Sequence, residues 1–165
     1  IVQLARLVGA APIIALDINP VVRDRALELG ADHVFDSRDP DLKSKVDDVT
    51  GGRGLDVAFD AVGRKVTFEQ ALDCLTVGGR LVAVGMSDES PTVGPTSEFG
   101  LTQKQVLGHL GCDNGDVEIL ARLVSLGRLD LSRSISRIVP LEEIHAGIEM
   151  LERGDGNPIR ILVQP

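Results

Sequence analysis

The sequence predicts an α/β protein built on a doubly wound parallel sheet that helices cover on both faces. Three observations predict this class. Short apolar segments typical of buried strands alternate with segments of helical period, their connections are short, and glycine, proline or a capping residue marks most boundaries. With 165 residues, of which 43% are hydrophobic and 25% charged, the chain is long enough to bury a core of its own.

The chain opens with the later part of a helix, because residues 1–8 carry apolar side chains at helical spacing and a glycine stops them. The apolar segment 12–16 predicts the first strand. Asn19 and Pro20 then supply a helix cap and a first-turn proline, which predicts a helix over residues 20–29.

Two short strands follow, at residues 33–36 and 55–60. Between them, Asp39 and Pro40 repeat the cap and the first-turn proline, so we expect a helix that ends at the glycine-rich segment GGRG. The buried stripe of that helix is predicted to be Leu42, Val46 and Val49.

The middle of the chain predicts a central strand and a long loop. Residues 65–75 form an amphipathic helix, and a turn at Gly78–Gly79 leads into the continuous apolar strand 80–85. Residues 86–104 lack a helical period and are rich in Ser, Thr, Pro and Gly, which predicts a surface loop before a strand at 105–110.

The last third of the chain predicts two helices and a closing strand. Asp113 and Asn114 can cap a helix over about residues 116–126, and a second apolar stripe predicts a helix over 141–152. Residues 159–163 form the last predicted strand.

Charge and cysteine content exclude several classes of partner. A formal charge of −8 without a Lys/Arg cluster disfavours nucleic acid and anionic membrane surfaces. Cys74 and Cys112 are too few for a disulfide framework, so we expect core or near-core thiols in a reducing compartment. No segment is apolar enough to span a bilayer and no basic region precedes an apolar stretch, which predicts a cytoplasmic protein.

The most informative residue is Asp17, which ends the apolar run of the first strand just before a helix. At this place in a nucleotide-binding α/β sheet, a carboxylate accepts hydrogen bonds from the ribose hydroxyls of an adenosine and repels a 2′-phosphate, so it favours NAD over NADP. The alternative is that Asp17 only caps the helix, in competition with Asn19. The glycine-rich turn that should hold the pyrophosphate would fall just upstream of Ile1.

Small residues follow three later strands, where open α/β sheets bind ligands. Such residues let a flat ring approach the backbone, and Arg64 could reach a ribose or a pyrophosphate. The alternative interpretation is that these residues form ordinary turns between strands and helices. The candidate residues are Ala61, Val62, Arg64, Val84, Gly85, Met86, His109, Leu110 and Gly111.

The sequence does not predict a metal site or a catalytic nucleophile. The three histidines are scattered and none has a cysteine or carboxylate at metal spacing. The acidic pairs Asp47–Asp48 and Glu142–Glu143 are typical of solvated helix positions. No Ser/His/Asp or Cys/His arrangement stands out.

The order and spacing of several segments resemble the C-terminal half of the zinc-type medium-chain alcohol dehydrogenases. The resemblance covers nearly all 165 residues and is more specific than any one motif. The segments are IVQLARLVGA, IIALDINP, RALELGADHVFD, VTGGRGLDVAFDAVG, ALDCLTVGGRLVAVG, LARLVSLGRLD and PLEEIHAGIEMLERG.

This resemblance implies a Rossmann-like fold and a residue-by-residue set of contacts with NAD. It places Asp17 on the adenosine ribose and Ile18 beside the adenine, and leaves the role of Arg23 open. It places Ala61, Val62 and Arg64 near the adenosine and pyrophosphate, and Val84, Gly85, Met86, His109, Leu110 and Gly111 near the nicotinamide carboxamide.

The departures from the family pattern predict a fragment. The first strand with its GxGxxG turn is absent, and so is the N-terminal domain that carries zinc in the family. We therefore expect a partial NAD-binding domain over residues 1–112, and a segment over 113–165 that packs on the absent catalytic domain in relatives. Loss of the first strand would leave backbone groups unpaired on two neighbours, so we also expect a substitute strand.

The parent function implied by the resemblance is NAD-dependent hydride transfer between an alcohol and its ketone or aldehyde, with the fragment itself inactive. A zinc-free quinone or enoyl reductase and a non-catalytic nucleotide-sensing module are the alternatives, and Asp17 argues against the former. Relatives form dimers or tetramers through sheet edges, so the segment 95–110 is the expected interface of a homo-oligomer.

Overall fold

The computed structural model describes residues 1–154 and 156–165. These residues form two compact units, Ile1–Gly111 and Cys112–Pro165, and each is described by itself. None of the described helices combines the length and the apolar character needed to cross a membrane.

The first unit begins with a helix and a pair of parallel strands, β1 (Ile14–Leu16) and β2 (His33–Phe35). Helix α1 (Val2–Leu7) precedes them, and α2 (Pro20–Glu28) connects the strands and packs against both. The predicted cap is confirmed, because the Asn19 side chain accepts a hydrogen bond from the Val21 amide and Pro20 opens the helix.

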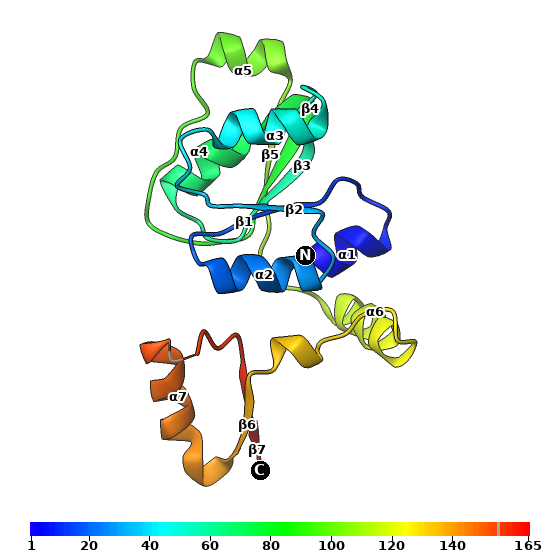
Figure 1. Ribbon diagram of the computed structural model, residues 1–165, viewed down its shortest axis with the longest axis vertical. Coiled ribbons are helices and arrows are strands. Elements are labelled where there is room, and N and C mark those ends of the chain that lie inside the picture. The colour runs from blue at the N-terminus through cyan, green and yellow to red at the C-terminus, as the bar shows by residue number, and fades with distance from the viewer. Residues whose placement is uncertain (155) are drawn as a thin grey trace. The chain divides into compact units, whose positions relative to one another are not determined.

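Three further strands form a second parallel sheet in the order β3 (Leu55–Asp60), β4 (Leu75–Ala83), β5 (Gln105–Gly108). Helix α4 (Lys65–Asp73) connects β3 to β4, and α5 (Thr96–Thr102) precedes β5. Alternating helices and parallel strands confirm the predicted α/β class (Figure 1).

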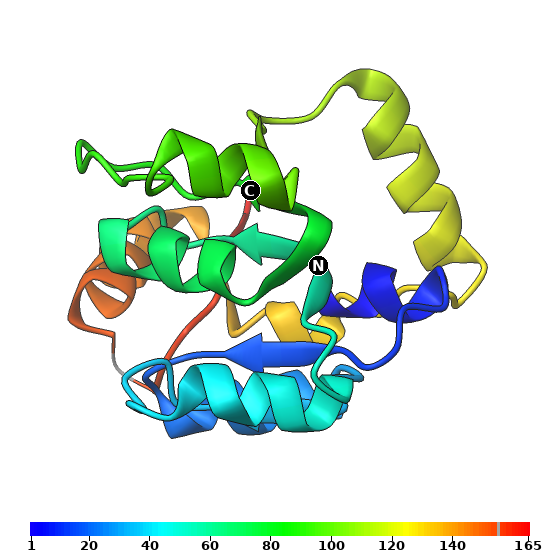
Figure 2. The ribbon, with the colours of Figure 1, turned by 90° about the horizontal axis from the view of Figure 1, so that it is seen from above.

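The two sheets of the first unit remain separate. Within the described residues, β1 pairs only with β2, and β3 pairs only with β4, so the substitute strand that we expected is not found. Figure 2 shows the blue strand β1 and the blue-green strand β3 running in the same direction. No ladder therefore connects β1 and β3 within the described residues.

Helix α3 (Leu42–Thr50) joins the two sheets through a shared core. Its Leu42 and Val46 are buried with Cys74, which directly precedes β4. Apolar side chains from both sheets pack on this cluster: Ile14, Leu16, Phe35 and Leu55. Burial of side chains of this size contributes about 2 kcal/mol each, so α3 stabilises the arrangement of the two sheets without strand pairing.

A second cluster stabilises the three-stranded sheet. It consists of Ala58, Leu72, Leu75 and Leu81, and Leu81 is fully buried. Phe68 of α4 and Phe99 of α5 pack against it.

The described residues of the second unit include the parallel strands β6 (Arg137–Pro140) and β7 (Ile161–Gln164) and the helices α6 (Asn114–Ser125) and α7 (Ile144–Arg153). Strands β6 and β7 pair with Val139 opposite Val163, and Val139 is 2% exposed. Gly147 lets α7 approach this sheet, because a Cβ there would lie 3.2 Å from the Ile161 side chain. The elements of the unit are α6 (Asn114–Ser125), η1 (Ser132–Ser134), β6 (Arg137–Pro140), η2 (Leu141–Glu143), α7 (Ile144–Arg153) and β7 (Ile161–Gln164).

The predicted turn at Gly78–Gly79 is wrong, because both glycines lie inside β4. The ladder between β3 and β4 shifts register after Leu55, which indicates a bulge. A Cβ on Gly79 would lie 2.8 Å from the Leu55 carbonyl oxygen, so the glycine marks a close approach of two strands instead of a turn.

Three other element boundaries also differ from the prediction. The predicted loop contains α5, whose seven residues are too few to give a clear helical period. Strand β6 was not predicted. Helix α3 begins at Leu42 and not at Pro40. The Asp39 side chain accepts a hydrogen bond from the Asp41 amide, which forms a turn before the helix.

Candidate functional site

All the site residues predicted from the sequence lie where strands end. Asp17 and Ile18 directly follow β1, and the other positions follow the three strands of the second sheet. The groups that follow β3, β4 and β5 are Ala61, Val62 and Arg64, then Val84, Gly85 and Met86, then His109, Leu110 and Gly111. Since paired strands are parallel, the residues after each strand lie at one edge of its sheet.

At the end of β1, Asp17 organises the turn into α2. One carboxylate oxygen, Oδ1, accepts a hydrogen bond of 2.8 Å from the Asn19 amide. The other oxygen has no hydrogen-bond partner among the described residues. Since Asn19, and not Asp17, caps the helix, one oxygen of Asp17 is available to a ligand. Ile18 beside it is 56% exposed.

Two arginines and a second carboxylate surround this turn. Arg23 donates a hydrogen bond of 2.7 Å to the Asp17 carbonyl oxygen and lies 3.5 Å from Asp36 Oδ2. Arg38 binds Asp36 through its backbone amide, Nε and a terminal nitrogen, at 2.9, 3.0 and 2.7 Å. These bonds hold the pKa of the Asp36 carboxyl well below its usual value, with the Arg38 side chain as the largest cause. Asp36 and Arg38 were not predicted as site residues, although Asp36 directly follows a strand and Arg38 lies two residues later.

At the end of β3, Asp60 connects two strand ends and a helix. It is 4% exposed, and its Oδ1 accepts hydrogen bonds from the amides of Val62 and Gly63, both at 3.1 Å, and from the Thr67 hydroxyl of α4 at 3.0 Å. The Asp60 carbonyl oxygen accepts hydrogen bonds from the amides of Val84 and Gly85, at 2.9 and 2.8 Å. This residue was also missed, since its role depends on the backbone that folds around it.

Gly63 and Gly85 bring the two strand ends into direct backbone contact. A Cβ on Gly63 would lie 2.5 Å from backbone atoms of Gly85 and Met86, and a Cβ on Gly85 would lie 2.3 Å from the Gly63 amide nitrogen. Gly63 also has a φ of +80°, which side chains disfavour. The glycines therefore fix the shape of the edge where β3 and β4 end.

The segment after β4 closes on the start of α4. The Ser87 hydroxyl donates a hydrogen bond to the Gly63 carbonyl oxygen. Glu89 accepts the Lys65 amide at 2.6 Å and the Arg64 Nε at 3.2 Å, and these bonds lower the pKa of its carboxyl, the Lys65 amide most. Arg64, which we expected to reach toward a ribose or a pyrophosphate, is thus paired with Glu89 in this structure.

An open pocket of about 620 Å³ lies over these strand ends. Met86 at its edge is 78% exposed. The pocket is lined by Asp60, Gly63, Phe68, Ala83, Gly85, Met86, Ser87, Asp88, Glu89 and Pro91. It therefore contains two of the predicted residues and backbone from both strands.

The tip of β5 lies next to the end of β4, because the His109 amide donates a hydrogen bond of 3.0 Å to the Ala83 carbonyl oxygen. Leu110 is 81% exposed. Gly111 has a φ of +65° and is the last residue of the first unit.

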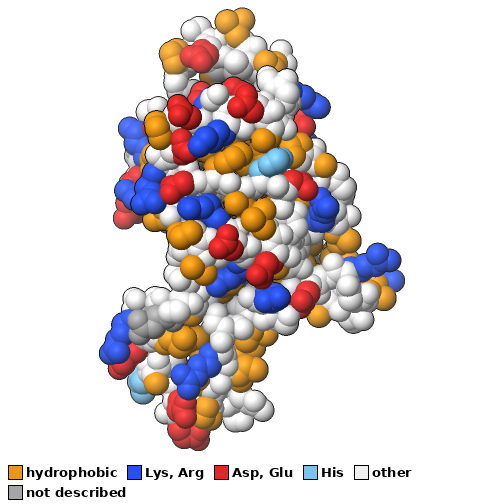
Figure 3. Space-filling model, in the orientation of Figure 1, with side chains coloured by type: hydrophobic (Ala, Val, Ile, Leu, Met, Phe, Trp, Pro, Cys, Tyr) orange, Lys and Arg blue, Asp and Glu red, His pale blue; other side chains and the backbone are white. Residues whose placement is uncertain are grey.

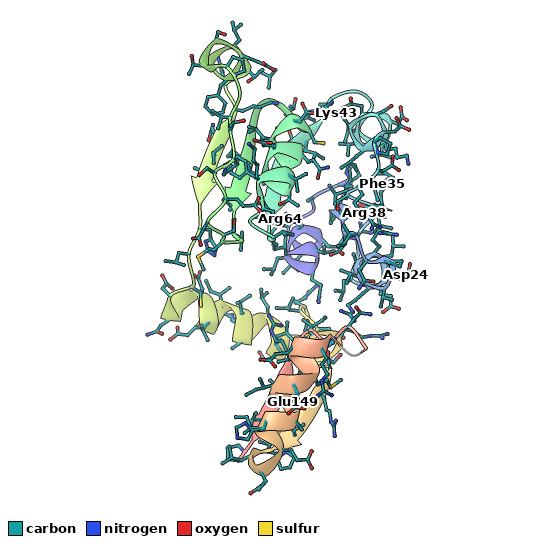
Figure 4. The ribbon with its side chains drawn as sticks, turned by 90° about the vertical axis from the view of Figure 1, so that its left-hand side faces the viewer. Asp24, Phe35, Arg38, Lys43, Arg64 and Glu149 are labelled. Carbon is teal, nitrogen blue, oxygen red and sulfur yellow. The ribbon has the colours of Figure 1, made fainter. Side chains whose placement is uncertain are left out.

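A hydrogen bond connects helix α4 with the segment that follows β2. The Gln70 side chain of α4 donates to the carbonyl oxygen of Ser37, close after β2, at 2.8 Å. Figure 4 shows Arg38 beside the β1–β2 part and Arg64 at the start of α4. Figure 3 shows positive and negative side chains interspersed on its face of the protein, without one large patch of a single sign.

The described residues contain no group of three or more His, Cys, Asp or Glu side chains that could hold a metal ion. A zinc ion needs three or four such donors, so these residues do not fit one. Cys74 is buried as predicted, and burial raises the pKa of its thiol to about 11. Cys112 is exposed, which corrects the expectation of a near-core thiol.

Comparison with known proteins identifies the family. The sequence model of the zinc-binding dehydrogenases matches residues 1–125. The chain belongs to the zinc-binding dehydrogenase family. An alcohol dehydrogenase of Cupriavidus necator is 34% identical to it over 98% of this chain and 44% of that protein. The resemblance noted in the sequence is thereby confirmed.

Solved structures of this family share the fold. The alcohol dehydrogenase of the hyperthermophilic archaeon Aeropyrum pernix is 32% identical and superposes with a TM-score of 0.82, covering 99% of this chain and 46% of that one. A structure described as an NAD-dependent alcohol dehydrogenase gives 27% identity and a TM-score of 0.83, over 99% and 46% of the two chains. This zinc-binding dehydrogenase chain has a Rossmann-type fold and spans less than half the length of these relatives.

Proposed function

We propose that this chain supplies the cofactor-binding part of an NAD-dependent alcohol dehydrogenase. The observation that carries the proposal is the Asp17 carboxylate, which lies at the end of β1 with one oxygen available to a ligand. A ribose diol offers two hydroxyl donors to such a carboxylate, whereas a 2′-phosphate would add like charge beside it.

The residues that would hold the cofactor follow from this placement. Asp17 would accept the ribose hydroxyls, and the exposed Ile18 would contact the adenine. Ala61, Val62 and Arg64 would line the adenosine and pyrophosphate part. Bound NAD supplies an acceptor for hydride at its nicotinamide ring.

The pocket over β3 and β4 would take the nicotinamide end. Gly85 and Met86 line it and Val84 precedes them, so backbone groups are available to a carboxamide. The tip of β5, with His109, Leu110 and Gly111, would complete this end. The chain's own contribution is to bind and orient the cofactor and to shield one face of its ring.

Residues other than these cofactor-binding residues would activate the alcohol. The described residues do not fit a zinc ion, so no step of the proposed reaction is assigned to a metal in this chain. We expect the isolated chain to lack dehydrogenase activity and to bind NAD weakly, because its sequence has no GxGxxG turn between a strand and a helix to hold the pyrophosphate. A small alcohol, ketone or aldehyde is the proposed substrate class of the intact protein.

We also propose that the protein self-associates through the edge strand β5. The strand has one paired neighbour among the described residues, and its Val106 and Leu107 are 37% and 44% exposed. An unpaired edge with apolar side chains favours pairing with a second copy. Sedimentation of the intact protein tests this: a dimer or tetramer supports it, and a monomer at high concentration contradicts it.

The decisive experiment compares NAD and NADP binding by the intact protein and its Asp17→Asn variant. We expect the natural protein to prefer NAD and the variant to bind NAD about tenfold more weakly, since it loses a charged acceptor. Asp24→Asn on the exposed face of α2 makes the same charge change and serves as the control. A natural protein that prefers NADP, or an Asp17 variant equal to the Asp24 control, would overturn the proposal.

A further inference from the structure

The cluster beside Asp17 contains more charge than ribose binding needs. In the register of β1 and β2, Leu16 lies opposite Phe35, so Asp17 and Asp36 are neighbours at the edge of the sheet. A hydrogen bond of 3.3 Å from the Asp17 amide to the Phe35 carbonyl oxygen continues the ladder to this point. Arg23 and Arg38 complete the cluster, so two carboxylates face two guanidinium groups.

Asp36 uses both of its oxygens on these arginines. Oδ1 accepts the backbone amide and Nε of Arg38, and Oδ2 accepts a terminal nitrogen of Arg38 and faces Arg23 at 3.5 Å. The pair with Arg38 is bidentate, which is the strongest geometry for a guanidinium and a carboxylate. The same donors of Arg38 are the ones that would hold a phosphate.

Both guanidinium groups are also turned toward the backbone of the turn that carries Asp17. Arg23 donates to the Asp17 carbonyl oxygen at 2.7 Å, and Arg38 donates to the Ile18 carbonyl oxygen at 3.4 Å. The Arg38 side chain is 68% exposed, and that of Arg23 is 20% exposed. Two cations therefore lie next to the place proposed for the ribose, and Asp36 pairs with both of them.

We propose that Asp36 is a second determinant of cofactor choice, which keeps Arg23 and Arg38 from a 2′-phosphate by pairing with both. The inference rests on the proposed function, because it takes Asp17 as the ribose residue. It adds that the preference for NAD depends on two carboxylates: Asp17 excludes the phosphate directly, and Asp36 withholds the cations that would otherwise attract it.

The test measures dissociation constants of NAD and NADP for the intact protein carrying Asp36→Asn. Asparagine keeps an oxygen for the Arg38 amide, so the turn after β2 retains its hydrogen bond while both arginines lose their counter-charge. We expect NADP to bind about tenfold more tightly and NAD to change less than about threefold. Because the effect is electrostatic, the gain in NADP affinity should shrink when the salt concentration is raised from about 0.1 M to about 0.5 M.

A matched control and a reversal separate this effect from a general change of charge. Asp56 pairs with Arg53 at the other end of the chain's second sheet, where β3 begins, so Asp56→Asn makes the same charge change away from the site. It should leave both dissociation constants unchanged. Adding Arg38→Gln to Asp36→Asn should remove most of the gain for NADP.

The outcomes distinguish the two proposals. A tenfold gain for NADP that Arg38→Gln reverses supports the role of Asp36. If Asp17→Asn weakens NAD binding as expected but Asp36→Asn leaves the ratio of the two constants equal to that of Asp56→Asn, this inference fails and the proposed function stands. If Asp36→Asn unfolds, Arg38→Gln alone decides: it leaves Asp36 with Arg23 as its remaining arginine partner and should weaken NADP binding further, and no change would overturn the inference.

Discussion

The two edges of the first unit are built in different ways. Where β1 and β2 end, four charged side chains form the surface, and their bonds run through long, partly exposed groups. Where β3 and β4 end, two glycines place backbone against backbone and a buried aspartate collects five hydrogen bonds on two of its oxygens. Charged side chains can select a ligand by its charge, whereas the packed backbone fixes the shape of the surface it meets.

This difference implies that the two edges respond differently to substitution. At the packed edge a single added methyl group has no space, so stability should change before binding does. At the charged edge the side chains touch water, so substitutions should change ligand preference with little effect on stability.

The largest effect is expected for Gly63→Ala. The new Cβ would lie 2.5 Å from the backbone of Gly85 and Met86, and the φ of +80° is itself unfavourable for alanine. We expect a loss of about 3 kcal/mol or more in the free energy of unfolding, measured by urea denaturation. Gly78→Ala is the control, since Gly78 has a φ of +75° but nothing within 4 Å, and it should cost about 1 kcal/mol. Equal losses would show that the close contact is unimportant.

Thiol labelling tests whether the core around α3 holds the two sheets of the first unit together. Cys74 lies in the core that joins both sheets, and its pKa is raised to about 11, so at pH 8 only a small fraction is the reactive thiolate. Exposed Cys112 should therefore react about 100-fold faster or more in the native protein. Reaction of Cys74 at a comparable rate would mean that α3 does not hold the sheets together.

A smaller loss is expected for Asp60→Ala. The substitution leaves the amides of Val62 and Gly63 and the Thr67 hydroxyl without their acceptor, which should cost about 2 kcal/mol. Asp60→Asn keeps an oxygen for these donors and should cost less than half as much. If both variants lose the same stability, the hydrogen bonds to the side chain do not organise this edge.

The smallest effect concerns the titration of Asp36. Its pKa lies well below the ordinary value of 3.8, so its ion pairs contribute fully above that value and weaken only as the pH falls through the lowered pKa. Carboxyl carbon shifts followed by NMR should show Asp36 still ionised at pH 3.8. In the variant Arg38→Gln the midpoint should rise toward the ordinary value, and an unchanged midpoint would contradict the role of Arg38.

Much of this arrangement could be predicted from local patterns. Asn19–Pro20 marked the start of α2, and the apolar runs before Asp17 and after Leu55 marked β1 and β3. The placement of Asp17 at a strand end followed from the same run. These features depend on residues close together in sequence, where periodicity and capping are informative.

Other features could not be predicted because they depend on distant segments. The glycines 78–79 suggested a turn, but the approach of the Leu55 carbonyl makes them part of a strand. The pairing of Arg38 with Asp36 places both beside Asp17 only because β1 and β2 are adjacent. Asp60 acquires its partners when β4 and α4 pack around it.

The sequence by itself determined the α/β class, the succession of most helices and strands, and the place of the Asp17 carboxylate directly after a strand, because each depends on local spacing and residue type. The tertiary structure alone decided that Asp36 pairs with two arginines, that the backbones of Gly63 and Gly85 are in contact, and that a helix instead of a strand joins the two sheets. The physical reason is that these contacts join atoms far apart along the chain, so they exist only once parallel strands and their helices have packed.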